Sequence, residues 1–478
     1  MKKQTLRLTA LALSASLLLA STASAQIGRR FPAEKTIVPD PVTGIPLTFL
    51  TSTPGGDSKI YQTHPQWTAD GKWLIFRSSR AAGQAMAVNE ETGDMVQVTE
   101  AGYTGMLCVA RLSMKLYVMR DPTRGSGRGG GAGAAPASGA PPAGRAGAGG
   151  SARSRTPFQI VEIDLARLFA DSAAGTLKFA SVYERVCGTI PAEMSAGGGD
   201  MALDAREDVA YFRLESPDLA SRLPPGTKIA EAFGPRGMGA GPSGLAGMNL
   251  KTGEITFIVA VPFKIGHVQT NPWVPGEIVF CWETGGKAPQ RTWTVRADGT
   301  GLRPLYPEAP YEWVTHEAVI TRDEVAIAIL GHRRPGGGVD VGQEAAWGPA
   351  GFPDHPTGVG IVNLRTREMR IVGQVPVGDP GVSIWHVNGS ADGRWAVADD
   401  FQYRLWLIDR HSGEMILLSD NGHRRTAADH QHPTFNADGT KVEIQSAMLS
   451  EDGRSMNICI VPVPKSWLAR TYAGTTAK

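Results

Sequence analysis

The chain has 478 residues, with 48 Lys and Arg against 46 Asp and Glu. This balance argues against nucleic acid as the main partner, because phosphate binding needs a basic surplus. A chain of this length can bury a large core without disulfides. The sequence leaves open whether its four cysteines are buried free thiols or include one bridge, since none forms a CxxC pair: Cys108, Cys187, Cys281 and Cys459.

Residues 1–25 are predicted to be a secretory signal peptide. Three basic residues precede an apolar run from Leu8 to Ala20, and Ala23-Ser24-Ala25 forms a small-residue cleavage site. The apolar run is too short for a comfortable membrane span, and no later segment supplies one. We therefore expect an exported protein, periplasmic or extracellular, without stable membrane insertion. Removal of the signal peptide leaves 45 basic against 46 acidic residues, a net charge of about −1.

The remaining residues, 26–478, read as one domain of short strands joined by tight turns. The strand-like run Trp73–Phe76 follows the turn Asp70-Gly71, and Met95–Val98 follows Thr92-Gly93. Apolar runs of period two that are closed by Asp-Gly or Thr-Gly are typical of antiparallel hairpins. We therefore expect an all-β protein.

Related units recur about every 40 residues, the period of a four-stranded propeller blade. The sequence predicts a seven-bladed β-propeller with four-stranded antiparallel blades. The expected blades lie at about 63–100, 104–190, 196–262, 267–308, 314–376, 384–420 and 430–464. The last blade is expected to take the segment 45–51 as its fourth strand, which would close the ring.

Three glycine-rich segments interrupt this pattern. The segment at about 123–156 is rich in Gly, Ala, Pro, Ser and Arg and has almost no large apolar residue. It cannot offset the entropy of ordering itself, so we expect a disordered surface loop within the second blade. The segments Gly234 to Gly247 and Pro335 to Pro356 are expected to be surface loops as well.

Histidines recur at one phase of the repeat. His64, His386 and His432 each stand six residues before an Asp-Gly turn, and His267 and His316 open similar stretches. Equivalent positions of a propeller converge on its axis, so these imidazoles are expected to meet in one pocket. Such a cluster suggests metal binding or base catalysis.

His430 and His432 are two residues apart. On a strand, both side chains would point to one face, and with His386 they would form a facial set of metal ligands. For a single histidine, a packing and turn motif remains the simpler interpretation. Three histidines in phase favour a metal.

Four motifs follow one another in the C-terminal two thirds. They are Arg-x-Trp at Arg291, Thr-His-Glu at Thr315–Glu317, the blade-opening His386, and His-x-His-Pro at His430–Pro433. In order and approximate spacing this region resembles oligogalacturonate lyase, a family of pectin-degrading polysaccharide lyases built on a seven-bladed TolB-like propeller. The resemblance implies that His316 is the Brønsted base and that Arg291 stabilises charge.

The resemblance also implies that His386, His430 and His432 bind a divalent metal, manganese in that family. The family's glutamine ligand corresponds to Ala427 here. Asp429, Gln431 or a water could replace it, and three imidazoles also suit zinc.

Several other residues near these motifs have two interpretations. His64 and His267 are either satisfied histidines at strand starts or part of a sugar channel. Three tryptophans could stack on sugar rings or belong to the propeller core: Trp282, Trp313 and Trp385. Arg424 and Arg425 could bind a second carboxylate.

The function that this resemblance implies is metal-dependent cleavage of an acidic, uronate-containing oligosaccharide by β-elimination, with oligogalacturonides from pectin as the expected substrates. Two alternatives remain open: a non-catalytic periplasmic TolB-like propeller that binds protein or glycan, and a metal hydrolase on the same scaffold. The sequence does not give the exact uronate, its chain length or the oligomeric state.

Overall fold

The computed structural model describes most of the chain after residue 25. The described ranges are 26–100, 102–123, 156–194, 199–232, 238–284, 288–309, 312–332, 357–375, 383–420 and 426–472. The predicted signal peptide lies outside the described residues. So do nearly all of the glycine-rich segment at 123–156 and the segment Pro335 to Pro356.

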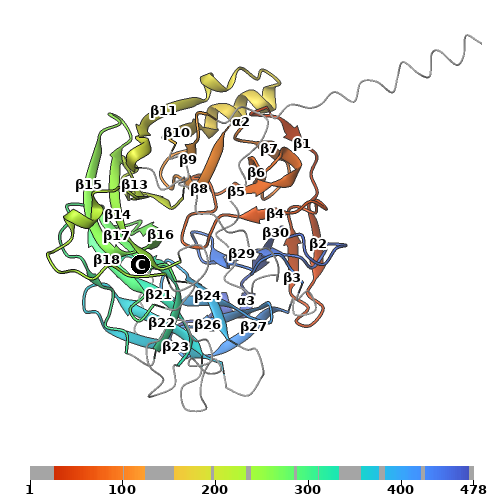
Figure 1. Ribbon diagram of the computed structural model, residues 1–478. Coiled ribbons are helices and arrows are strands. Elements are labelled where there is room, and N and C mark those ends of the chain that lie inside the picture. Colours follow the sequence, from red (N-terminus) through yellow and green to blue (C-terminus); the bar gives the residue numbers. More distant parts are fainter. Residues whose placement is uncertain are drawn as a thin grey trace, which may run out of the picture.

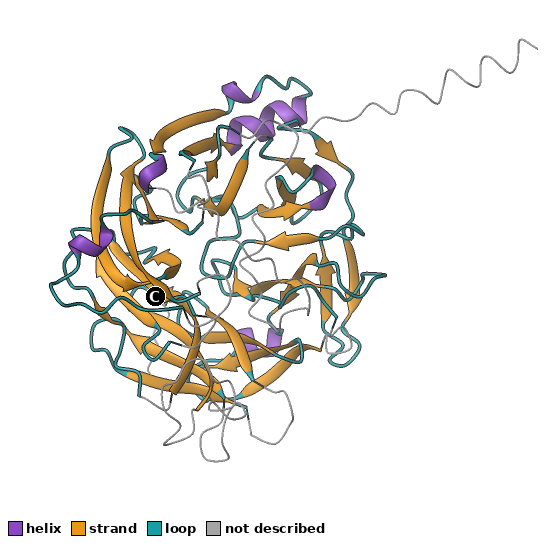
Figure 2. Ribbon diagram, viewed as in Figure 1, coloured by secondary structure: helices purple, strands orange, loops and turns teal. Residues whose placement is uncertain are grey.

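Seven antiparallel sheets follow one another in chain order around a central axis (Figure 1). This confirms the predicted seven-bladed β-propeller, and Figure 2 shows how strongly strands dominate it. The first sheet contains β1 (Arg30–Phe31), β4 (Asp57–Lys59), β5 (Trp73–Ser78), β6 (Ala85–Asn89) and β7 (Met95–Gln97). The second contains β8 (Tyr103–Val109), β9 (Lys115–Arg120), β10 (Phe158–Asp164) and β11 (Glu184–Ile190). The third contains β12 (Met201–Leu203), β13 (Val209–Leu214), β14 (Ala240–Asn249) and β15 (Ile255–Phe263).

The next three sheets have four strands each. The fourth sheet contains β16 (Ile265–Thr270), β17 (Glu277–Trp282), β18 (Thr292–Arg296) and β19 (Arg303–Pro304). The fifth contains β20 (Glu312–Thr321), β21 (Glu324–His332), β22 (Gly358–Asn363) and β23 (Met369–Gln374). The sixth contains β24 (Ile384–Gly389), β25 (Trp395–Asp400), β26 (Arg404–Asp409) and β27 (Met415–Asp420). In these three sheets the first strand is the innermost, because β16 contacts β20, β20 contacts β24, and β24 contacts β28.

The seventh sheet closes the ring with strands from both ends of the chain. It contains β28 (Thr434–Phe435), β29 (Lys441–Ser446), β30 (Asn457–Pro462), β3 (Pro46–Phe49) and β2 (Thr36–Pro39). Thr48 and Phe49 of β3 pair with Ile460 and Cys459 of β30, as the sequence predicted. The extra edge strands β1 and β2 were not predicted. They make the first and the last sheet five-stranded (Figure 1).

The second blade also carries a helix that the strand pattern did not predict. The Asp164 carboxylate accepts the backbone N–H of Arg167 and caps the start of α2 (Leu165–Ala174), and Gly175 ends the helix at a φ of 68°. Leu165 and Leu168 pack into the core between the first two blades. The other helical segments are short: α3 (Lys465–Leu468), η1 (Ser79–Ala81), η2 (Ala180–Val182), η3 (Ala192–Met194) and η4 (Leu219–Arg222).

The prediction of a surface loop from Gly234 to Gly247 is wrong for the second half of this segment, where the chain forms β14. The glycines there are needed for close packing within the sheet. A Cβ at Gly244 would meet the carbonyl oxygen of Val259 at 3.1 Å, and one at Gly247 would meet the Tyr211 ring at 3.1 Å. A glycine-rich composition can therefore indicate crowding as well as flexibility.

All four cysteines are buried free thiols, which settles the choice that the sequence left open. Within the described part of the chain, none of the helices is long and apolar enough to span a membrane.

Candidate active site and metal centre

Three innermost strands carry a β-bulge where their histidine stands. In β20, Val314 pairs with Ile329 and Glu317 with Ile327, so Thr315 and His316 share the place of one residue. The bulge of β24 lies between Ile384 and Val387 and contains His386. The bulge of β16 lies between Gly266 and Gln269 and contains His267. A bulge changes the direction in which side chains point. In these three strands the bulge lies where the histidine side chains converge.

The histidine rings form a continuous chain of contacts. The centroid distances are 5.6 Å from His267 to His316, 4.2 Å from His316 to His386, and 3.9 Å from His386 to His432. His430 lies 5.6 Å from His386. The structure therefore brings together all four histidines of the predicted site and adds His267.

His64 does not join this cluster, so the expectation that all five repeat-phase histidines meet in one pocket is wrong for this residue. Its Nε2 lies 2.7 Å from the carbonyl oxygen of Met201, and its Nδ1 lies 2.8 Å from the Thr63 hydroxyl. Nε2–H therefore donates to the carbonyl and Nδ1 accepts from the hydroxyl. Both ring nitrogens are satisfied within the protein, which agrees with the structural interpretation of this residue.

Asp399 on β25 organises the half of the site that contains His386, His430 and His432, the candidate metal-binding half. Its carboxylate accepts the backbone N–H groups of His386, Gln431 and His432 at 2.7, 3.0 and 3.1 Å. It also accepts Nδ1–H of the His386 ring at 3.0 Å. Because Nδ1 carries the proton, Nε2 of His386 keeps its lone pair for a metal, and the carboxylate fixes the ring orientation.

His430 and His432 do not lie on a strand, contrary to the prediction. They precede β28, and His432 has a left-handed φ of 51°. The N–H groups of Gln431 and His432 donate to the buried Asp399 side chain, and the carbonyl of Gln431 accepts the backbone N–H of Gln445 on β29 at 3.1 Å. The two rings still converge on the site, through a strained loop of the kind that recurs at functional sites.

The ring nitrogens of His432 and His430 fit a cation. Nδ1–H of His432 donates to Oε1 of Gln62 at 3.0 Å, which leaves a lone pair on Nε2. That Nε2 lies 3.1 Å from Oδ1 of Asp429. Two lone pairs that face each other at this distance repel, unless a proton or a metal ion lies between them. Nδ1 of His430 is buried and has no hydrogen-bond partner among the described residues.

Of the two residues expected to replace a ligand at Ala427, Asp429 faces His432 with its carboxylate, and Gln431 has a buried side-chain amide without a hydrogen-bond partner among the described residues. Burial raises the pKa of Asp429, but the neighbouring His432 and a backbone N–H lower it more, so the carboxyl is ionised at neutral pH. Burial lowers the pKa of His386 and of His430, which keeps both rings neutral, as ligation requires.

Replacing Asp399 with asparagine is expected to lower metal affinity by about 10–100-fold, the usual cost of losing an outer-shell partner. The amide would present N–H to the His386 ring, so that Nε2 instead of Nδ1 would carry the ring proton. Metal titration of the purified variant checks this. Asp400→Asn is the matched control, because Asp400 is also buried but bonds Arg404 and Trp406. Equal losses in both variants would contradict the assignment.

His316 lies beside the metal-binding half and has one free nitrogen. Its Nδ1–H donates to the carbonyl oxygen of Trp385 at 2.7 Å. A carbonyl oxygen can only accept, so Nε2 holds the lone pair. The Trp385 indole closes on the ring at a centroid distance of 4.6 Å. Burial, followed by the charges of His386 and Arg291, lowers the pKa of His316 well below 6.5. The ring is therefore neutral and can accept a proton.

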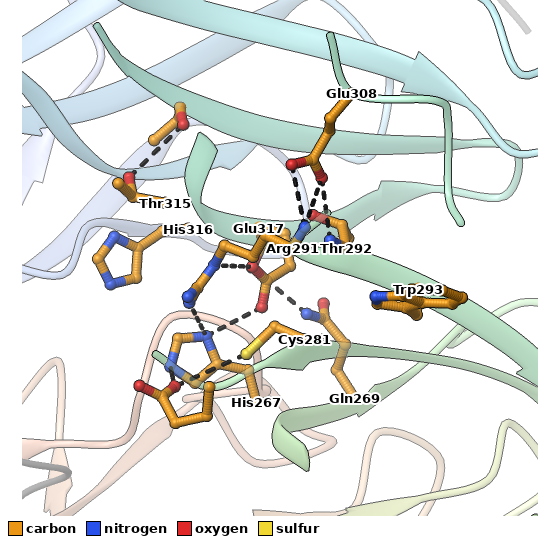
Figure 3. A network of polar contacts seen from close by, with 12 residues as sticks. His267, Gln269, Cys281, Arg291, Thr292, Trp293, Glu308, Thr315, His316 and Glu317 are labelled. Carbon is orange, nitrogen blue, oxygen red and sulfur yellow. Dashed lines mark hydrogen bonds and ion pairs between the residues drawn. The ribbon is translucent and has the colours of Figure 1, made fainter. Parts of the chain in front are cut away.

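Arg291 is held in place from both its backbone and its side chain (Figure 3). The Glu308 carboxylate accepts the N–H groups of Arg291 and Thr292 at 3.0 Å. The buried guanidinium donates from Nε to Glu317 at 3.2 Å, and Nη2 lies 3.3 Å from Nδ1 of His267. Its Nη1 is buried without a hydrogen-bond partner among the described residues, so a donor remains for an incoming anion.

Four further residues of the site were assigned no role from the sequence. Glu317 is fully buried and accepts from both Arg291 and His267, whose Nδ1 lies 2.9 Å away. Tyr61, between β4 and β5, contacts His267 and His432 at centroid distances of 4.9 and 5.0 Å. It thus bridges the two halves of the site. Asp399 and Glu308 are the other two.

The other expected contributors are only partly brought to the site. Trp385 contacts His316, but Trp282 stacks on Phe263 at 5.0 Å as part of the core of its blade. Trp313 lies on β20, three residues before His316. Arg424 and Arg425 lie outside the described residues.

Fold and site together define a seven-bladed propeller with a buried histidine cluster at its axis. Two solved structures of oligogalacturonate lyases share this fold. One, described as in complex with manganese, has a TM-score of 0.65 at 17% sequence identity, covering 93% of this chain and all of its own. The other, from Vibrio parahaemolyticus, has a TM-score of 0.64 at 18% identity with the same coverage. No protein-family model and no curated protein sequence matches the chain.

Proposed function

We propose that this protein is a metal-dependent lyase that cleaves uronate-containing oligosaccharides by β-elimination, with oligogalacturonides as the leading candidates. The observation that carries the proposal is a neutral imidazole, His316, whose ring lies 4.2 Å from His386 of the histidine cluster and 5.6 Å from His267, which the buried Arg291 also contacts. The fold shared with oligogalacturonate lyases, one of them a manganese complex, supports it.

The chemistry of a uronate matches these groups. The proton on C5 is only weakly acidic, so its removal needs a base and stabilisation of the charge that develops on the adjacent carboxylate. A divalent metal held by His386, His430, His432 and Asp429 would supply Lewis-acid stabilisation of that charge. Nε2 of His316 accepts the C5 proton. Arg291 offers Nη1–H to a carboxylate oxygen.

The elimination then balances within the sugar. The electron pair of the C5–H bond forms the double bond between C4 and C5, and the C4–O bond breaks. The leaving oxygen takes a proton, and the new end is a 4,5-unsaturated uronate. No water is consumed, which separates this reaction from hydrolysis.

The activity is expected to persist at acidic pH. Only neutral His316 can act as the base, and its pKa is lowered well below 6.5 by burial, so the ring becomes protonated only at a pH well below that value. The profile of kcat/KM against pH should therefore have its acid limb below pH 6.5. An acid limb at or above pH 6.5 would show that another group provides the base.

Reconstitution tests the proposal as a whole. Purified mature protein is stripped with chelator, reloaded with manganese or zinc, and incubated with a panel of uronate oligosaccharides that includes unsaturated digalacturonate. We expect cleavage that depends on the metal. A protein that holds no metal and cleaves no uronate would instead support a non-catalytic binding propeller. The predicted signal peptide leads us to propose that the protein acts outside the cytoplasm.

A further inference from the structure

A second group of metal-ligand side chains lies beside Arg291 and includes His267, whose ring centroid is 5.6 Å from that of His316. One ligand atom from each of His267, Cys281 and Glu283 can be chosen so that all lie within 4.8 Å of one another. Nε2 of His267 is 3.4 Å from Oε2 of Glu283, and Sγ of Cys281 is 3.7 Å from the same oxygen. Ligands of one tetrahedral zinc ion are separated by about 3.3 Å for nitrogen and oxygen, and about 3.5 Å for sulfur and oxygen.

His267 has a carboxylate beside each ring nitrogen. Its second nitrogen, Nδ1, lies 2.9 Å from the buried Glu317 carboxylate, which Arg291 also holds (Figure 3). A carboxylate behind the ring fixes the tautomer and makes the imidazole a better ligand. The backbone of His267 has a left-handed φ of 50° within the bulge of β16, so the ring direction is set at a cost in strain.

Gly266 leaves room for the third ligand. A Cβ at this position would meet Cβ of Glu283 at 2.8 Å and its Oε2 at 2.9 Å. The Glu283 side chain therefore folds over a residue without a side chain and reaches His267. Its side chain is 24% exposed, so a fourth position at this group can be reached from solvent.

We propose that His267, Cys281 and Glu283 form a second metal site, separate from the His386, His430 and His432 cluster, for a divalent ion that accepts sulfur, such as zinc. One thiolate, one imidazole and one carboxylate suit such an ion and leave one coordination position open. On binding, the Cys281 thiol releases its proton to solvent.

This site would have its own spectroscopic signal. Cys281 is completely buried, and its Sγ is the one sulfur atom of the proposed site. The first cluster contains no cysteine. Thiolate ligation of an added metal therefore reports on Cys281, whether or not the protein is a lyase.

The experiment is a titration of metal-free, full-length mature protein with cobalt(II), followed by near-ultraviolet absorption. We expect a thiolate-to-cobalt charge-transfer band in the wild type and in His386→Ala. The band should be lost in Cys281→Ser and His267→Ala and kept in the matched control Cys108→Ser, since Cys108 bonds the carbonyl of Met201. Gly266→Ala should at least halve the band at a fixed subsaturating cobalt concentration.

Two results would overturn the proposal: no charge-transfer band in the wild type, or a band that survives Cys281→Ser. Circular dichroism of each variant, and manganese binding by Cys281→Ser at the first cluster, separate loss of a ligand from loss of the fold. A normal cobalt band in a protein that cleaves no uronate would leave this site intact and remove only the proposed lyase function.

Discussion

Replacing His316 with alanine is expected to lower kcat by about 10²–10⁴-fold, the usual contribution of a positioned general base. The metal content should stay at the wild-type level, because His316 donates Nδ1–H to the Trp385 carbonyl and is not needed by the ligands. Steady-state kinetics and metal analysis of the same preparation measure both quantities.

An exposed histidine provides the control for this variant. His411 lies on the surface and stacks on Tyr472, at a centroid distance of 4.1 Å. His411→Ala should keep both turnover and metal. Normal turnover of His316→Ala would show that the base is assigned to the wrong residue. A loss of metal from that variant would show that His316 is a ligand instead.

Replacing His430 with alanine is expected to remove both metal and activity. The buried Nδ1 of His430 has no protein partner among the described residues, while its ring packs between Tyr403 and Phe401, at centroid distances of 5.0 and 5.5 Å. Circular dichroism of the variant therefore has to accompany the metal analysis. The loss of metal affinity should exceed the roughly 10–100-fold cost of an outer-shell change, because a ligand itself is removed.

His64 tests whether repeat phase alone confers this role. It has the phase of His386 and His432, but both of its ring nitrogens are satisfied by Thr63 and Met201. His64→Gln should therefore keep metal and activity, although the free energy of unfolding falls because a buried hydrogen-bond pair is disturbed.

If His430→Ala kept its metal, the assigned ligand set would be wrong.

A carboxylate in place of a neutral amide would change the character of the first metal site. With Asp429 as the fourth ligand, the site carries one more negative charge than three imidazoles and a glutamine. A harder, more anionic ligand set binds divalent cations more strongly and favours oxygen-preferring ions such as manganese. The substitution at Ala427 therefore does not by itself argue for zinc.

The blade pattern was predictable because it rests on local rules. Asp-Gly and Thr-Gly turns between apolar runs set the hairpins, and a 40-residue period sets the number of blades. Closure by the segment at 45–51 followed from the need to pair the last edge, and β3 fills that place. The helix α2 was not predicted, because its apolar residues, such as Leu165 and Leu168, follow directly on the strand β10.

Repeat phase predicted that the histidines converge, and the resemblance pointed to Arg291, which has no repeat phase. His316 and His386 open equivalent strands, so the closed ring brings them together. Tyr61, Asp399 and Glu317 have no such phase. Asp399 stands beside Asp400 in a strand, and nothing in the sequence shows which carboxylate faces the histidines. The arrangement of His430 and His432 depends on a left-handed backbone, which no residue pattern in that segment indicates.

Product analysis in oxygen-18 water tests the central claim most directly. Manganese-loaded protein is incubated with a uronate oligosaccharide in labelled water, and both products are analysed by mass spectrometry. β-Elimination predicts one unsaturated product, no label at the cleaved bond, and loss of the reaction with chelator. Incorporation of one labelled oxygen with two saturated products would show hydrolysis and contradict the assignment of His316 as the base that removes the C5 proton.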